Sequence, residues 1–108
     1  MKRHNGSLEL MIMLAIMRLE DAAYGVPISR EIEESAGREV AMATVYASLD
    51  RLEARGLVKS KLGDPTPERG GRAKKFFQVT GSGVRLVRET HDGLTAMWRG
   101  LSVLKGRA

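Results

Sequence analysis

The chain has 108 residues, of which 43% are hydrophobic and 29% are charged. This size and balance fit one globular domain with a single modest core and exclude a disordered chain. It contains no cysteine, which excludes disulfides, thiolate metal sites and thiol catalysis. The apolar stretch at residues 8–19 is too short to cross a bilayer and no cleavage pattern follows it, so we expect a cytoplasmic protein without membrane contact.

The net charge of +5 is distributed unevenly along the chain. Residues 20–40 carry six acidic and two basic side chains, whereas residues 59–75 carry six basic and two acidic ones. A chain polarised in this way has one surface suited to a polyanion and another that is not. A lone basic cluster is often only solvated surface, but this one falls on a predicted hairpin, which favours a function for it.

The first predicted helix runs from Leu8 to about Leu19, with Ser7 as its N-cap. Its apolar side chains lie on almost every side of the helix, so it must be buried on more than one face. The second face would be covered either by another subunit or by the rest of the same domain, and the segment alone favours neither.

Two shorter helices follow. Pro27 fits the first turn of the second helix, because its missing N–H is not needed there, and Gly37 marks the end. The third helix covers about Met42 to Arg55 and stops at Gly56. It turns Val45, Leu49 and Leu52 inward, and its other side carries the short or polar residues Thr44, Ala47, Ser48 and Arg51. A face of this kind can approach DNA base edges closely.

A basic β-hairpin comes next, with strands at about Leu57–Leu62 and Lys75–Val79 and with Phe77 and Val79 facing the core. Its loop runs from Gly63 to Ala73 and is longer than a normal hairpin loop, which favours a functional role. A helix sized for a DNA groove beside a basic β-ribbon is the arrangement of a winged helix-turn-helix. The expected fold is therefore mainly α with a small hairpin.

The last predicted helix begins after a Thr80 cap and extends from about Gly81 to Leu104. Its apolar positions, Val84, Val87, Leu94, Trp98 and Leu101, recur at a spacing of three to four residues or a multiple of it. Such a long amphipathic helix at the end of a small domain has too little domain left to pack against, so dimerisation is the economical explanation. We expect a winged-helix domain over residues 7–80 and a dimerisation helix over residues 81–108.

The order of these elements and several sequence blocks resemble the PadR family of bacterial transcriptional regulators over about residues 7–90. The blocks are Leu8-Glu9-Leu10, Tyr24-Gly25-Val26-Pro27-Ile28, Thr44-Val45-Tyr46-Ala47-Ser48-Leu49-Asp50-Arg51-Leu52-Glu53, Gly56-Leu57-Val58, Glu68-Arg69-Gly70-Gly71-Arg72, Lys74-Lys75-Phe76-Phe77 and Thr80-Gly81-Ser82-Gly83. The sequence departs from the family at Ala41 and Ala43, where a serine and a glycine are frequent. We therefore expect the DNA sequence to be recognised mainly by Thr44, by Ser48 and by the hairpin, which is the wing of a winged helix-turn-helix.

The resemblance implies a homodimeric repressor that binds a pseudo-palindromic site on double-stranded DNA, with the third helix in the major groove and the wing on the flanking backbone. It also implies that Tyr24 and Tyr46 lie near phosphates, although each tyrosine could instead be a core residue whose hydroxyl reaches the surface. The expected DNA contacts are Tyr24, Thr44, Tyr46, Ser48, Arg51, Arg69, Arg72, Lys74 and Lys75. The expected dimer contacts are Leu10, Met13, Val87, Leu94, Trp98 and Leu101.

Alternative interpretations remain at three points. Trp98 could contact a flat small-molecule effector of unknown identity, as a tryptophan in this region does in some relatives, but an interface anchor is favoured. An enzyme is disfavoured, because His4 and His91 lie in no nucleophile or metal constellation, and we expect no cofactor and no metal. The main alternative function is a winged-helix module that dimerises and binds protein without specific DNA readout.

Overall fold

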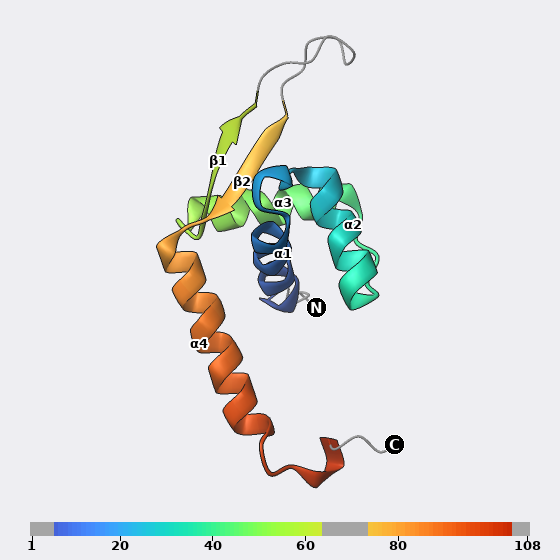
Figure 1. Ribbon diagram of the computed structural model, residues 1–108, viewed down its shortest axis with the longest axis vertical. Helices are drawn as coiled ribbons and strands as arrows, with labels where there is room; N and C mark the ends of the chain where they lie inside the picture. Colours follow the sequence, from blue (N-terminus) through green and yellow to red (C-terminus); the bar gives the residue numbers. More distant parts are fainter. Residues whose placement is uncertain (1–5, 64–73, 105–108) are drawn as a thin grey trace.

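The structure is a computed structural model that describes residues 6–63 and 74–104. The predicted contacts Arg69 and Arg72 lie outside these residues. The chain forms three helices, an antiparallel hairpin and a fourth helix that projects away from the rest (Figure 1). In order, the elements are α1 (Gly6–Leu19), η1 (Glu20–Ala22), α2 (Gly25–Ala36), α3 (Met42–Ala54), β1 (Val58–Leu62), β2 (Lys75–Val79), α4 (Gly81–Trp98) and η3 (Ser102–Leu104).

Helix α1 lies at the centre of the core and is covered by the same chain on more than one side. Ile12 and Met13 are 0% and 1% exposed, whereas Leu14 is 47% exposed. The expectation that Met13 contributes to a dimer surface is therefore wrong, since its side chain already packs in the monomer. The expectation that Ser7 caps this helix is also wrong, because α1 begins at Gly6 and Ser7 therefore lies within the helix.

Helices α2 and α3 form the predicted helix-turn-helix. Helix α2 begins at Gly25, with Pro27 in its first turn, and Gly37 follows its last residue as expected. Helix α3 begins after Ala41 and turns its apolar side into the core, where Val45, Leu49 and Leu52 are each 0% exposed. These two helices confirm the sequence prediction to within about one residue.

The hairpin is joined to the helical core through β2. Its register pairs Val58 with Val79 and Leu62 with Lys75. The β2 residue Phe77 is 4% exposed, and its backbone N–H donates to the carbonyl of Ala23 at 2.8 Å. Because Ala23 lies between η1 and α2, this bond fixes the hairpin beside the start of α2.

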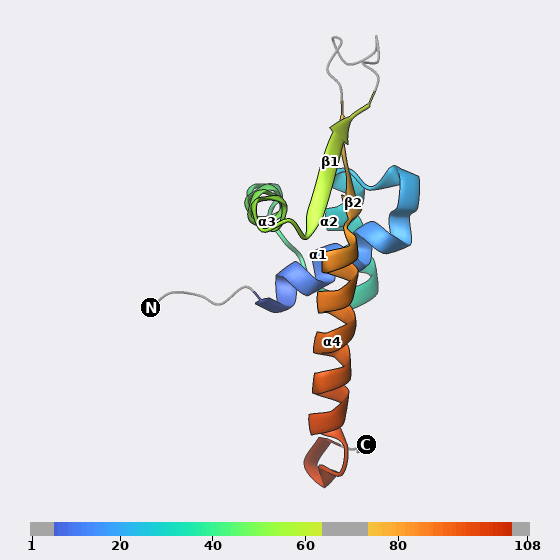
Figure 2. The same ribbon diagram turned by 90° about the vertical axis from the view of Figure 1, so that its left-hand side faces the viewer.

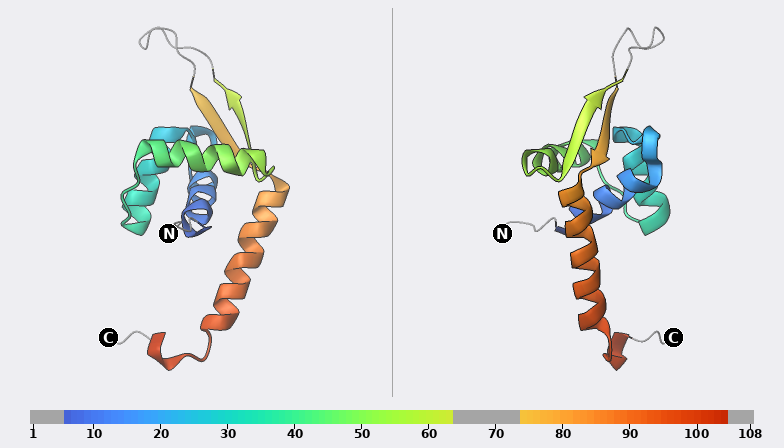
Figure 3. Two further views of the ribbon diagram at one scale, coloured as in Figure 1. Left: turned by 180° about the vertical axis from the view of Figure 1, so that it is seen from behind. Right: turned by 60° about the vertical axis from the view of Figure 1, so that its left-hand side comes forward.

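Helix α4 starts at the base of the hairpin, where Thr80 Oγ1 accepts a hydrogen bond from Gly83 N–H at 3.1 Å, as predicted for a cap. It then leads away from the three-helix core, and this extends the molecule to 55 × 31 × 29 Å (Figures 1 and 3). The helix ends at Trp98 and not at Leu104. Gly100 adopts φ 84°, a left-handed conformation that turns the chain before η3.

Candidate nucleic-acid interface

Helix α3 presents one face to solvent. Figure 2 looks nearly along its axis, with the hairpin and the other helices to one side. Thr44 and Tyr46, two predicted DNA contacts, lie on this face. Ser48 does not: its side chain is 0% exposed, so the prediction that it contacts DNA is wrong. It lies about 40° around the helix from Thr44, on the side turned toward α1. The exposed residues of α3 are Ala43, Thr44, Tyr46, Ala47, Asp50, Arg51 and Ala54.

Arg51, another predicted DNA contact, is held by a network that the sequence did not reveal. Its Nη2 donates to the buried Ser48 hydroxyl at 3.1 Å, and its Nε donates to Glu9 Oε2 at 3.2 Å. Arg55 Nη1 donates to the other oxygen of the same carboxylate, also at 3.2 Å. The Glu9 side chain is only 16% exposed. One carboxylate of α1 thus offsets half of the charge of two arginines, one on α3 and one directly after it.

This network predicts that Glu9→Gln strengthens binding to random-sequence duplex DNA. Arg51 and Arg55 keep their charge but lose the carboxylate that balances them. We expect the slope of log affinity against log salt to steepen by up to about 0.9 for each positive charge released. The measurement is a salt titration of binding, with Glu33→Gln on the exposed side of α2 as the control for net charge. Equal effects of the two substitutions would contradict this role of Glu9.

A second cluster forms where α2 begins. The Tyr46 hydroxyl lies against Gly25, so closely that a Cβ at that glycine would overlap it. The neighbouring Tyr24 is partly buried, and its ring packs edge-on against Phe76 with 5.4 Å between the ring centroids. Lys74 Nζ lies 4.5 Å from the centre of the Tyr24 ring, a cation–π contact. The fold therefore brings three predicted DNA contacts, Tyr24, Tyr46 and Lys74, to one helix N-terminus.

Lys75 has a different environment. Its Nζ lies 3.6 Å from Glu53 Oε1 on α3, and Ser60 donates to Glu53 Oε2 at 2.6 Å. The hydrogen bond from Ser60, and then the charge of Lys75, hold the pKa of Glu53 below its ordinary value. The carboxylate therefore stays ionised to a lower pH than an unperturbed glutamate would, and it ties the hairpin to α3. Lys75 remains a predicted DNA contact, but part of its charge is already balanced.

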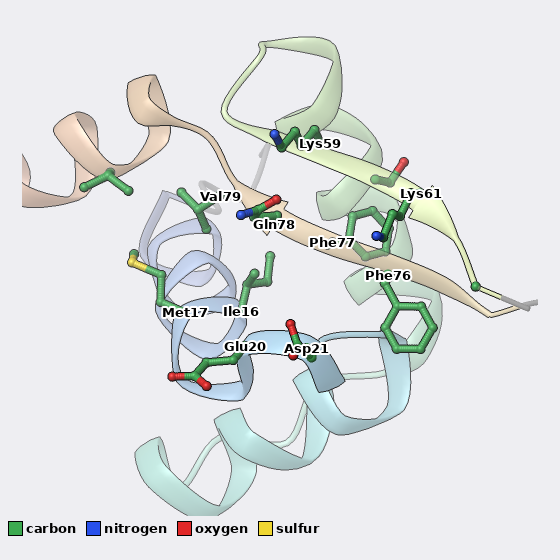
Figure 4. A pocket seen from close by; sticks show the side chains of 13 residues that line it. Ile16, Met17, Glu20, Asp21, Lys59, Lys61, Phe76, Phe77, Gln78 and Val79 are labelled. Carbon is green, nitrogen blue, oxygen red and sulfur yellow. The ribbon is translucent and has the colours of Figure 1, made fainter.

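A cleft of about 1020 Å³ lies between the hairpin and the end of α1 (Figure 4). Lys59, Lys61 and Phe76 line its hairpin side, and Glu20 and Asp21 line the opposite side. Side chains alternate along a strand, so these hairpin residues face away from α3, toward which Ser60 points. The acidic residues of η1 therefore lie behind the hairpin and do not oppose a polyanion at α3.

The outer part of α4 and the residues directly after it leave apolar side chains exposed. Leu94 is 60% exposed, Met97 78%, Trp98 58% and Leu101 48%. We call these four residues the distal apolar surface. Trp98 and Leu94 also line a hollow of about 450 Å³. Two other predicted dimer contacts, Leu10 and Val87, are partly buried against the core.

Two further observations concern metal sites and membrane-spanning helices. In the part of the chain that the structure describes, no three histidine or carboxylate side chains gather as a metal site would require, and His91 and Asp92 form only an exposed pair at 3.4 Å. Within residues 6–63 and 74–104, no helix has the length and apolar character needed to span a membrane.

A three-helix core whose third helix is exposed on one face, with an antiparallel hairpin beside that helix, defines a winged-helix DNA-binding protein. A family model described as "Transcriptional regulator PadR-like family" matches residues 13–89. The chain belongs to this family: it is a DNA-binding transcriptional regulator and not an enzyme. No curated protein sequence matches it significantly.

Several solved structures resemble the chain over nearly its whole length. A PadR-like transcription factor from Bacteroides fragilis has a TM-score of 0.75 and 25% identity, with 94% of this chain and 92% of that chain covered. A PadR family transcriptional regulator from Eggerthella lenta has a TM-score of 0.68 and 26% identity, covering 93% and 88%. A PadR-like regulator from Bacillus cereus has a TM-score of 0.71, 22% identity and coverage of 95% and 96%. These likenesses agree with the predicted winged-helix fold.

Proposed function

We propose that two copies of this chain form a dimer that represses transcription by binding a pseudo-palindromic DNA site, and that a signal of unknown identity releases it. Residues 7–80 serve as the DNA-binding unit and residues 81–108 as the dimerisation segment. Since its target is DNA, we place it in the cytoplasm. The observation that carries the proposal is the cluster of Tyr24, Tyr46 and Lys74 at the start of α2, beside the exposed face of α3.

The cluster has the chemistry of a phosphate site. The first backbone N–H groups of a helix have no partner within it, and they attract anions together with the helix dipole. Tyrosine hydroxyls and a lysine are common donors to DNA phosphates. A phosphate bound here would fix the register of α3 in the major groove, with Thr44 near base edges and Arg51 at the side of this face where Glu9 and Ser48 hold it. The wing, including Arg69 and Arg72, would then follow the flanking backbone.

The distal apolar surface supports the dimer. Four large apolar side chains exposed on one short segment are costly for a monomer, and burying them against a second copy removes that cost. A dimer with two-fold symmetry presents two copies of α3, which would require a site with matching symmetry. In this arrangement Trp98 acts as an interface anchor, and a flat effector would have to compete with that packing.

The direct test is binding of the full chain to random-sequence duplex DNA and to duplexes selected from genomic fragments. We expect binding to the random duplex at about 50 mM salt and a loss of about 10³-fold or more at 200 mM, as phosphate contacts dictate. Selected fragments should bind more tightly and contain inverted half-sites. Lack of any binding at the lower salt would instead favour the protein-interaction module.

Lys74→Ala tests the proposed phosphate site. We expect weaker binding to every duplex and a salt slope that is smaller by about one for each protomer, because one phosphate contact is lost. Arg88→Ala removes the same charge from α4, and it should leave the slope nearly unchanged. A slope equal to that of the wild type in Lys74→Ala would remove this lysine from the interface.

A further inference from the structure

The middle of the exposed face of α3 carries a single polar side chain. Ala43, Ala47, Asp50 and Ala54 follow one another at intervals of four, three and four residues, so they form one line along the helix. All four are exposed. Three of them offer only a methyl group. The carboxylate of Asp50 is thus the hydrogen-bonding side chain on this line, and when ionised it can only accept.

Within residues 6–63 and 74–104, this carboxylate forms no ion pair and no side-chain hydrogen bond. Its helical neighbours at three and four residues are Tyr46, Ala47, Glu53 and Ala54, and none is a cation. Glu9 and Glu53, by contrast, are each bound to basic or hydroxyl side chains. A bare carboxylate at the centre of a DNA-binding face opposes binding to any phosphate chain. A hydrogen-bond donor on a base edge would offset this repulsion.

We propose that Asp50 reads sequence by accepting a hydrogen bond from the N4 amino group of a cytosine in each half-site. This inference rests on the proposed function and adds a specificity-determining residue to it. In the major groove, the hydrogen-bond donors on the base edges are the amino groups at cytosine N4 and adenine N6. Adenine places the acceptor N7 beside its amino group, and that atom repels a carboxylate. Cytosine has no such acceptor on this edge and is the better partner.

The short neighbours of Asp50 make the contact geometrically reasonable. An aspartate reaches only a short distance from its helix, so the backbone of α3 must come close to the bases. The methyl groups of Ala47 and Ala54 on either side permit this approach and suit the methyl group of thymine. Arg51 does not interfere, because Glu9 and Ser48 draw it toward α1.

The test is selection of bound sequences from a randomised duplex pool by the full-length wild type, Asp50→Asn and Asp50→Ala. We expect the wild type to select a C·G pair at one position of each half-site and to lose roughly ten- to hundred-fold in affinity when that pair is replaced. Asp50→Ala should lose the preference at this position alone. Asp50→Asn should shift it toward adenine, whose N6 and N7 suit an amide.

Asp92→Asn on α4 is the matched control, since it removes the same charge away from α3. It should select the same sequences as the wild type, and circular dichroism should show all variants folded. Identical base preferences in the wild type and both Asp50 variants, with affinity raised evenly for all duplexes, would overturn the reading role and leave Asp50 a general repulsive charge. A wild type that binds no duplex at about 50 mM salt would instead overturn the proposed function and this inference with it.

Discussion

Replacing Trp98 by alanine is expected to convert the proposed dimer largely into monomers. Trp98 is 58% exposed at the end of α4, beside Leu94 and the rest of the distal apolar surface. A buried tryptophan at an interface is commonly an anchor worth about 2 kcal/mol or more, so the dimer dissociation constant should rise by about thirty-fold or more. Sedimentation across a protein dilution series measures this constant directly.

The same substitution should weaken binding to a two-half-site operator more than binding to a single half-site. A dimer gains from holding the second half-site at a high effective concentration, and a monomer loses that gain. Val26→Ala is the control for the sedimentation measurement, because Val26 is 45% exposed on α2 and outside the distal apolar surface. If Trp98→Ala sediments as the wild type does at every concentration, this surface does not hold the dimer together.

The sequence predicted those parts of the fold that strong local signals define. Pro27 marks the first turn of α2 and Gly37 its end, Gly56 follows α3, and the alternation around Phe77 identifies β2. Gly100 was a local signal as well, since a glycine after a helix commonly marks its end, but the apolar spacing beyond it favoured a longer helix. The prediction that α4 extends to Leu104 was wrong, although Gly100 could have indicated its earlier end.

Other features depend on contacts between distant parts of the chain. A helical wheel separates Ser48 from Thr44 by only about 40°, so whether Ser48 is exposed depends on how closely α1 approaches. Glu9 and Arg51 are 42 residues apart, and no local pattern pairs them. The apolar surface of α1 was likewise ambiguous, because the core and a partner subunit would bury a side chain such as Met13 equally well.

The junction between the hairpin and α4 determines how a dimer would place its two DNA-binding units. Thr80 Oγ1 donates to the carbonyl of Gly56 at 2.7 Å, and Thr80 N–H donates to the carbonyl of Leu57 at 3.0 Å. Gly83 packs directly on this joint and is buried. Since α4 contacts the core mainly near its start, this joint sets the direction of the whole helix.

Gly83→Ala is therefore expected to destabilise the protein and to disturb that direction. A Cβ at Gly83 would overlap the carbonyl oxygen of Leu57, a backbone atom that cannot swing aside as a side-chain tip can. Overpacking of this kind costs about 1–3 kcal/mol. In a domain of this size, that corresponds to a fall in melting temperature of roughly 5–20 °C, measurable by thermal denaturation.

Gly93→Ala provides a control within the same helix. A Cβ at Gly93 would meet no atom within 4 Å, so alanine there should leave the melting temperature unchanged or raise it through better helix propensity. A lower melting temperature for Gly83→Ala but not for Gly93→Ala would show that the loss of stability arises at the junction. The junction sets the direction of α4 and thus the distance between the two DNA-binding units of a dimer. Folded Gly83→Ala dimers should therefore also bind an operator with the natural half-site spacing less tightly than Gly93→Ala dimers do. Equal melting temperatures and equal operator affinities would mean that α4 is not fixed by this contact.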